Sequence, residues 1–157
     1  MFKKIQIRLI SVLIAVFLLV FSVSSAFAAA PLALHIEVDE VFSQEVETFT
    51  ASGQAVESGL VCGTGAVSES SFVGRGRHGA NVLILFVTKH FTCGDDSGSF
   101  DIKMVVLLDN TTSYTTASWH VAGGTGDYEK LVGSGSLVGT PIVLGVSIHD
   151  VYDGQVH

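Results

Sequence analysis

The sequence lacks the motifs that identify most enzymes and metalloproteins. It contains no G-x-S-x-G nucleophile elbow, no H-E-x-x-H metal motif and no phosphate-binding P-loop. Its six histidines form no H-x-H or i, i+4 pair, so no zinc site is expected. The acidic segments 95–96 and 150–153 lack the spacing of an EF-hand loop. The sequence therefore predicts no metal and no cofactor, and it favours a binding or structural protein over an enzyme.

The first 28 residues have the three-part pattern of a secretory signal peptide. Two lysines and an arginine within the first eight residues precede an apolar run over 9–23. That run is shorter than the ~20 residues of a membrane-spanning helix, which argues against an uncleaved anchor. Small residues follow and end in A-F-A at 26–28. We therefore expect a helical signal peptide over 1–28, cleaved before Ala29, and a single secreted domain over 29–157.

Basic residues are scarce in the expected mature domain. Without the three in the signal, 5 of the 8 basic residues remain against 15 acidic ones, which gives a net charge of −10. Such a charge disfavours binding to nucleic acid and to anionic membranes. We therefore expect no nucleic-acid partner, and no membrane association once the signal has been removed.

Cysteine is scarce as well, since Cys62 and Cys93 are the only two in the sequence. An exported pair commonly forms a disulfide. There is no C-x-x-C spacing or adjacent histidine that would indicate a reactive or metal-binding thiol pair instead. The bridge would close a loop of about 30 residues and would stabilise the fold by roughly 3–4 kcal/mol in the chain-entropy model.

Long helical patterns are also missing from the mature chain. Instead, β-rich runs alternate with turns that contain Gly, Asn, Asp and Ser, at 94–98, 110–113, 123–127 and 139–141. Eight antiparallel strands with short links favour a closed barrel, which leaves no exposed edge, and a two-sheet sandwich is the alternative. The expected strands are 32–39, 45–51, 59–69, 81–92, 99–109, 114–122, 131–138 and 141–152.

Two of these strands predict how they pair. A four-residue loop at 110–113 would place Trp119 opposite Met104 and Val121 opposite Ile102, so that the apolar faces of both strands coincide. The segment 82–87 is apolar on both faces, so its outer face needs a second cover. A partner subunit or another sheet would provide that cover.

The candidate polar site lies near the C-terminus. Alternate residues of 146–152 share one face, which carries Asp150 and Tyr152 after two apolar residues. If that face points inward, a buried Asp150 marks a polar site in the barrel or at its mouth, because an unpaired buried acid is costly. Alternatively the strand has ended by Asp150 and the carboxylate is in solvent, which is the interpretation we favour. His149 is a weaker candidate.

The segment from Trp119 to Leu137 reads W-H-V-A-G-G-T-G-D-Y-E-K-L-V-G-S-G-S-L. It resembles the glycine-rich hairpin shared by the allene oxide cyclase and dirigent-type barrel proteins, in which a GGTG-type turn precedes an aromatic residue and a small-residue strand. Glycine permits left-handed turn angles and relieves crowding in a curved strand. Tyr128 and Leu131 are expected to pack back on the hairpin. The structural residues of this hairpin are Gly123, Gly124, Gly126, Tyr128, Gly133 and Gly135.

The mature sequence as a whole resembles secreted bacterial proteins of that barrel type, through segments 58–62, 88–93 and 96–100 and a closing D-x-Y-x-G at 150–154. The resemblance implies an eight-stranded barrel, often a homo-oligomer, with a central cavity suited to a small apolar molecule. We therefore predict a secreted barrel that binds a small apolar ligand. A structural or interaction module and a cofactor-free isomerase or cyclase are the alternatives. No catalytic residue is assigned.

Overall fold

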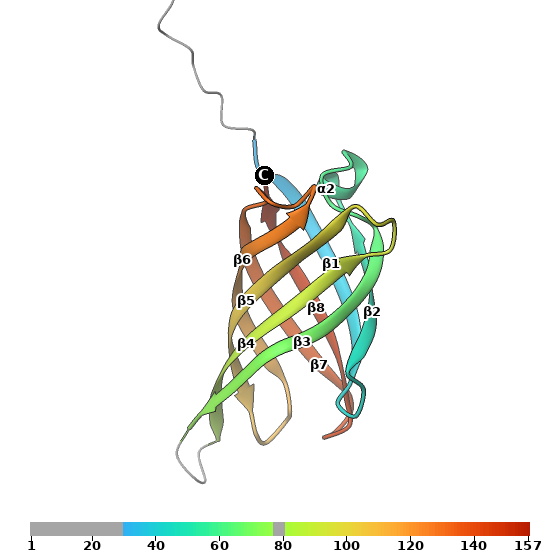
Figure 1. The fold of residues 1–157 in the computed structure, drawn as a ribbon. Helices are drawn as coiled ribbons and strands as arrows, with labels where there is room; N and C mark the ends of the chain where they lie inside the picture. The colour runs from blue at the N-terminus through green and yellow to red at the C-terminus, as the bar shows by residue number, and fades with distance from the viewer. Residues whose placement is uncertain (1–29, 77–80) are drawn as a thin grey trace, which may run out of the picture.

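The computed structural model describes residues 30–76 and 81–157, which form an all-β barrel (Figure 1). The predicted signal peptide over 1–28 lies outside these residues. The single-turn helix α2 (Gln54–Glu57) follows the second strand, and no helix in the described ranges is long and apolar enough to cross a membrane. The strands are β1 (Leu32–Val41), β2 (Val46–Ser52), β3 (Thr64–Arg75), β4 (Val82–Cys93), β5 (Gly98–Asp109), β6 (Thr115–Gly126), β7 (Gly133–Val143) and β8 (Ser147–Val156).

Every strand pairs with its neighbours in the sequence, and β1 pairs with β8 to close the barrel. The closing ladder runs antiparallel from Leu32 opposite Val156 to Val41 opposite Ser147. Each strand is therefore paired on both sides over at least part of its length, and the barrel has no edge strand of the kind that an open sheet would carry. The predicted eight-stranded antiparallel barrel is confirmed, and the alternative two-sheet sandwich is wrong.

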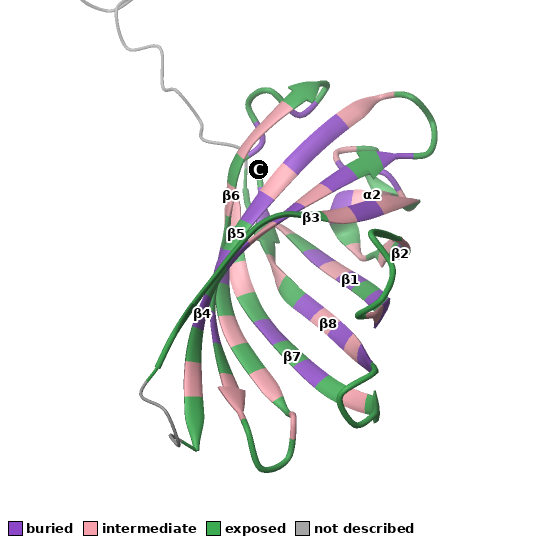
Figure 2. Cartoon of the chain, turned by 60° about the horizontal axis from the view of Figure 1, so that its bottom comes forward, coloured by how far each residue is buried: buried purple, intermediate pink, exposed green. Residues whose placement is uncertain are grey.

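The interior of the barrel follows the two-residue alternation of its strands, visible as alternating buried and exposed bands in Figure 2. Its upper half, at the end that carries α2, is filled by aromatic rings. The Phe91 ring is stacked on Phe100 at 5.1 Å and meets the edges of Phe49 at 5.2 Å and Tyr152 at 5.8 Å. These four side chains are almost completely buried. This half of the barrel is a packed core.

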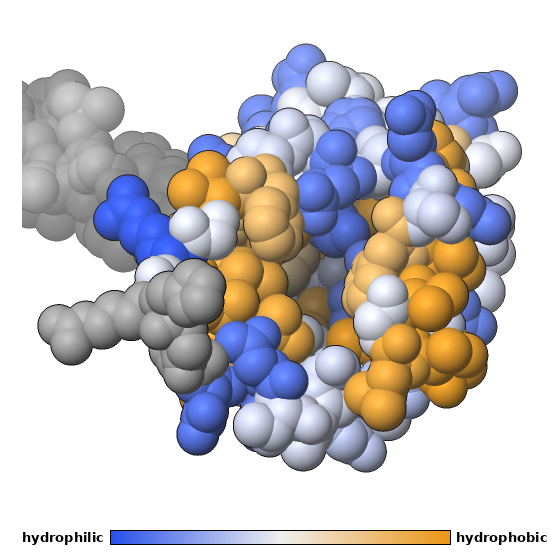
Figure 3. All heavy atoms as spheres, turned by 90° about the horizontal axis from the view of Figure 1, so that it is seen from below, coloured by the Kyte–Doolittle hydropathy of each residue, from blue (hydrophilic) through white to orange (hydrophobic). Residues whose placement is uncertain are grey.

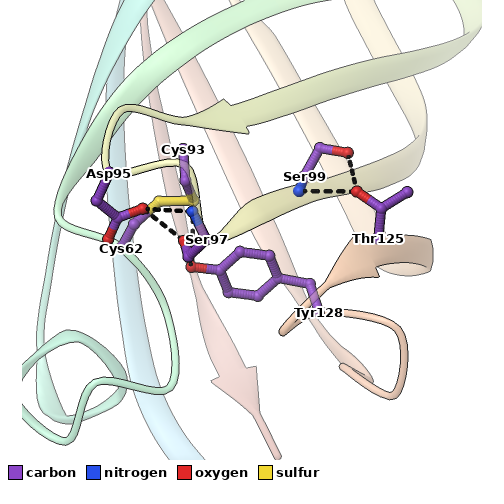
Figure 4. The surroundings of a disulfide bond; sticks show 7 residues. All are labelled: Cys62, Cys93, Asp95, Ser97, Ser99, Thr125 and Tyr128. Atoms are coloured by element: carbon purple, nitrogen blue, oxygen red, sulfur yellow. Dashed lines mark hydrogen bonds between the residues drawn. A yellow bond between two sulfur atoms is a disulfide. The ribbon is translucent and has the colours of Figure 1, made fainter.

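The upper end is tied together by the predicted disulfide, which the structure confirms (Figure 4). Cys62 precedes β3 and Cys93 ends β4, with their Cα atoms 5.9 Å apart. The Tyr128 hydroxyl lies 3.2 Å from Sγ of Cys93 and 2.7 Å from Oγ of Ser97. Tyr128 and Leu131 are buried, as expected, so the turn between β6 and β7 also covers this end.

The predicted strand 59–69 is wrong at both ends. The chain forms α2 and a turn before β3, in which the backbone N–H groups of Leu60 and Val61 both donate to the carbonyl of Ala55. These bonds close the turn after α2, and the buried side chains of Ala55 and Val61 pack it onto the core. At the other end, β3 continues to Arg75, because a bulge between Glu69 and Ser71 restores its pairing with β4.

Two predicted turns are strand instead. The GGTG segment belongs to β6, which ends at Gly126, where φ is +61° and glycine is favoured. The predicted turn at 139–141 lies inside β7, and the chain reverses at 144–146. Pro141 is tolerated there because β6 pairs with β7 only as far as Gly139, so no β6 carbonyl requires a proline N–H.

The predicted pairing of β5 with β6 is confirmed. Met104 lies opposite Trp119 and Ile102 opposite Val121, with both apolar faces inside the barrel. Gly135 relieves crowding in the curved strand, as expected. A Cβ at this position would overlap the Trp119 ring and the backbone of β8. Trp119 is thereby buried, and its Nε1 donates to the Ser136 carbonyl over 2.8 Å.

The strand β4 is apolar on both faces, as the sequence indicates. Leu85 and Val87 are buried inside the barrel, whereas Ile84 and Phe86 are exposed on the outside. Phe86 lies opposite Val105, which is exposed on the outer face of β5. This apolar outer face is consistent with the expected homo-oligomer, which stays a prediction.

Candidate functional site

The lower half of the barrel encloses a cavity of about 380 Å³. Seen from below, this end of the molecule is hollowed, with hydrophobic residues around the hollow (Figure 3). The volume lies at the lower end of the range for sites that bind small molecules. The walls are mostly apolar and include Leu85, Val87, Met104, Val106, Leu137 and Ile148.

A layer of charged side chains separates this cavity from the aromatic core. Lys89 donates from Nζ to Oε2 of Glu40 over 2.9 Å, and both residues are more than nine-tenths buried. A second carboxylate, that of Glu69, lies 3.8 Å from the same Nζ. Glu40 is on β1 and Lys89 on β4, which are not neighbours in the sheet, so this ion pair crosses the barrel interior.

Asp150 belongs to the same layer. It is 7% exposed, lines the cavity, and its Oδ1 has no hydrogen-bond partner. Burial, and then the negative charge of Glu40, raise the pKa of Asp150 from 3.8 to about 7, against the smaller opposing effect of Lys89. Gly139 lies opposite Asp150 in the ladder, and a Cβ there would overlap the Asp150 carboxyl. The absent side chain leaves room for that group.

The favoured interpretation of Asp150 is therefore wrong. The strand does not end there, because β8 pairs with both β1 and β7 as far as Val156. Alternate residues of β8, from Ile148 to Tyr152, thus face the interior and carry the Asp150 carboxyl with them. The strand begins at Ser147, so Val146 precedes the alternation and is exposed.

The other two candidates lie elsewhere. Tyr152 is fully buried in the aromatic core, and its hydroxyl has no hydrogen-bond partner. Burial, and next the charge of Asp150, raise the pKa of that hydroxyl. His149 points to the outer face of the barrel, where its Nδ1 lies 2.6 Å from Oδ1 of Asp39. The prediction that His149 is a cavity residue is therefore wrong, because neighbouring residues of a strand face opposite sides.

A groove opens beside the cavity. It measures about 720 Å³ and shares with the cavity the side chains of Glu40, Glu69 and Lys89. The groove lies where β2 begins at Val46, opposite Ser68, while β3 continues to Arg75 without a β2 partner. Four carboxylates line it, from Glu40, Glu45, Glu47 and Glu69.

The charge of this groove affects its own carboxyl groups. Burial, and then the negative charge of Glu40, raise the pKa of Glu47, although Lys89 acts in the opposite direction. The same Glu40 charge acts on Asp150. Carboxylates in the groove and the cavity therefore repel one another, and the single ammonium of Lys89 does not compensate for all of them.

Sequence reasoning missed Glu40, Glu69 and Lys89. A signal was present, because each charge continues the inward-facing alternation of its strand. Glu40 follows Ile36 and Val38 on β1, and Lys89 lies between two inward-facing residues of β4, Val87 and Phe91. A charged residue at an inward-facing position of a strand therefore indicates a polar group inside the barrel.

The outer face of the closing ladder carries two histidine–aspartate pairs. His35 lies opposite Asp153, with Nδ1 2.7 Å from Oδ1, and its Nε2 lies 3.2 Å from Oε1 of Glu37. His149 and Asp39 form the second pair, further along the same two strands. Each pair links the first strand of the barrel to the last.

Replacing His35 by glutamine is expected to remove a small stabilisation that depends on pH. Hydrogen bonds with Asp153, and then with Glu37, raise the pKa of His35. The stabilisation is therefore complete below the unfolded-state pKa of about 6.5 and is lost as the pH rises through the higher folded-state value. Because His35 is more than one third exposed, we expect only about 0.5 kcal/mol or less.

Urea unfolding of wild type and variant at about pH 5.5 and about pH 8.5 measures this effect on either side of the histidine pKa. His120→Gln is the matched control, since His120 is exposed on the outer face of β6 opposite Lys103. A His35→Gln loss of equal size at both pH values would contradict the assignment.

The fold and this site define the chain as a closed eight-stranded antiparallel β-barrel, sealed by aromatic rings at one end and hollow at the other. No protein-family model, curated protein or solved structure matches the sequence or the fold.

Proposed function

We propose that this barrel binds a small, largely apolar molecule in its lower cavity. The observation that carries the proposal is the contrast between the two halves of the interior. The upper half is filled by stacked rings, whereas the lower half has space of about 380 Å³ between apolar walls. A barrel that acts only through its outer surface would be expected to fill both halves with side chains.

Two further observations support a secreted binding protein. The disulfide between Cys62 and Cys93 fits an oxidising compartment, in agreement with the signal peptide that the sequence predicts. The resemblance of the Trp119–Leu137 segment to allene oxide cyclase and dirigent-type barrels implies a central cavity for a small apolar molecule. We therefore include export and membership of this barrel type in the proposal.

Binding can be tested with N-phenyl-1-naphthylamine, an uncharged apolar dye that fluoresces more strongly in apolar surroundings. We expect saturable binding of one dye per barrel. Val106→Trp places a large ring in the cavity, because Val106 is buried on its wall. This variant is expected to weaken dye binding by about tenfold or more, which corresponds to roughly 1.4 kcal/mol.

Val105→Trp is the matched control, since Val105 is the preceding residue of β5 and is exposed on the outer face. It should bind the dye as wild type does. Thermal unfolding of both variants verifies that each is folded. Absence of saturable binding by wild type, or equal binding by the two folded variants, would remove the proposed site.

A further inference from the structure

We propose that the ligand of this cavity is an amphiphilic amine, whose ammonium group binds the neighbouring carboxyl groups of Glu40 and Asp150 and whose apolar body lies along the cavity wall. This inference rests on the proposed binding function and names its ligand class. It follows from the charge of the groove, from unpartnered oxygen atoms in the polar layer, and from the existing partners of Lys89.

The charge around the site favours a cation. Carboxylates line both the groove and the cavity. Lys89 is the single basic residue among the described residues that line either of them. A cationic ligand would reduce the repulsion between these carboxylates, whereas an anionic ligand would increase it. The carboxylates belong to Glu40, Glu45, Glu47, Glu69 and Asp150.

The polar layer contains oxygen atoms that lack hydrogen-bond donors. Oε1 of Glu40 and Oδ1 of Asp150 are buried without a donor from another protein group. The Asp150 side chain is within hydrogen-bonding reach of Glu40, so two carboxyl groups face each other here. Buried polar atoms without partners are costly, so they point to a group that the ligand supplies. A primary ammonium has three N–H donors and no acceptor, which matches carboxylate oxygens better than a hydroxyl or carboxylate head group does.

Lys89 does not offer an equivalent site for an anion. Its Nζ already lies 2.9 Å from Oε2 of Glu40 and 3.8 Å from Oε2 of Glu69. A ligand carboxylate would have to compete with these two groups and would lie close to Asp150. The apolar wall beyond the layer, which includes Val106 and Ile148, then accommodates an aliphatic body.

Three probes with the same ten-carbon chain test this assignment: decylamine, 1-decanol and decanoate. Each competes with N-phenyl-1-naphthylamine for the wild-type protein at about pH 8, where an amine with a pKa near 10.4 is protonated. We expect decylamine to bind about tenfold or more tightly than decanol, because its hydrogen bonds to carboxylates are charge-assisted. Decanoate should bind most weakly.

Asp150→Asn should reduce the preference for decylamine over decanol by about tenfold. Asp153→Asn is the matched control, because it removes one carboxyl from the same strand but from the outer face, where Asp153 contacts His35. It should leave the preference unchanged. The preference should also persist at about 1 M salt, where surface charges are screened within about 3 Å.

The outcomes separate the two proposals. If the dye shows no saturable binding that Val106→Trp weakens, binding in the cavity itself is refuted. If the dye binds there but decylamine does not displace it, the amine assignment is overturned. If decanol or decanoate binds as tightly as decylamine, the barrel binds apolar molecules but the amine assignment is overturned. An amine preference that Asp150→Asn and Asp153→Asn reduce equally would arise from net charge alone, and it would overturn the assignment as well.

Discussion

Replacing Lys89 by methionine is expected to lower the free energy of unfolding by about 3–5 kcal/mol, the range for removal of one partner from a buried ion pair. The Nζ of Lys89 lies 2.9 Å from Glu40 inside the barrel, and both residues are more than nine-tenths buried. Without it, the Glu40 carboxylate would be buried close to Asp150 with no compensating cation. Urea unfolding at neutral pH measures the loss.

The pH dependence of this loss separates a buried charge from a lost packing contact. In the Lys89→Met variant, protonation of the buried carboxyls should recover part of the stability as the pH falls. The double variant Glu40→Leu/Lys89→Met should be more stable than Lys89→Met alone, because it leaves no unpaired charge from the pair. A difference between the two that is independent of pH would contradict this explanation.

Lys103→Met provides the matched control on the neighbouring strand β5. Lys103 is exposed on the outer face, opposite Thr88 and His120. Its replacement should change the stability by no more than about 0.5 kcal/mol. A cost of Lys89→Met as small as that of Lys103→Met would show that the ion pair does not cross the interior of the barrel.

Much of this fold could be predicted from the sequence, because local alternation decides which face of each strand is buried. The pairing of Met104 with Trp119 followed from the apolar face of each strand and the length of one loop. The errors lie where glycine and proline were interpreted as turns. Gly139 and Pro141 both lie inside β7. A side chain at Gly139 would collide with the Asp150 carboxyl, and Pro141 lies beyond the last β7 residue that pairs with β6, so its missing N–H is not required. Both conditions depend on the assembled barrel.

The site was less accessible to prediction, for a different physical reason. Asp150 was identified as a candidate, but its direction depended on whether β8 continued, and that is decided by its pairing with β1 and β7. The contact between Glu40 and Lys89 joins residues 49 positions apart on strands that are not neighbours. Such a contact depends on how the barrel closes and how its strands tilt. A single strand contains no information about it.

Replacing Asp150 by asparagine is expected to stabilise the protein at alkaline pH. Burial, and next the charge of Glu40, raise the pKa of Asp150 from 3.8 to about 7. Between these two values the folded protein holds a proton that the unfolded chain releases, so the stability of the wild type falls as the pH rises. A pKa difference of one corresponds to about 1.4 kcal/mol, which sets an upper limit of roughly 4 kcal/mol at about pH 8.

Urea unfolding from about pH 4 to about pH 8 tests this, because the difference between Asp150→Asn and wild type should grow with pH over the range in which the carboxyl ionises. Asp153→Asn, on the outer face of the same strand, should show no such gain. Parallel curves for Asp150→Asn and wild type would show that the carboxyl titrates normally. If Asp150 serves to bind a cationic ligand, Asp150→Asn should gain stability and lose the preference for decylamine. Such a loss of stability in return for function is expected of a functional group that is buried at a cost.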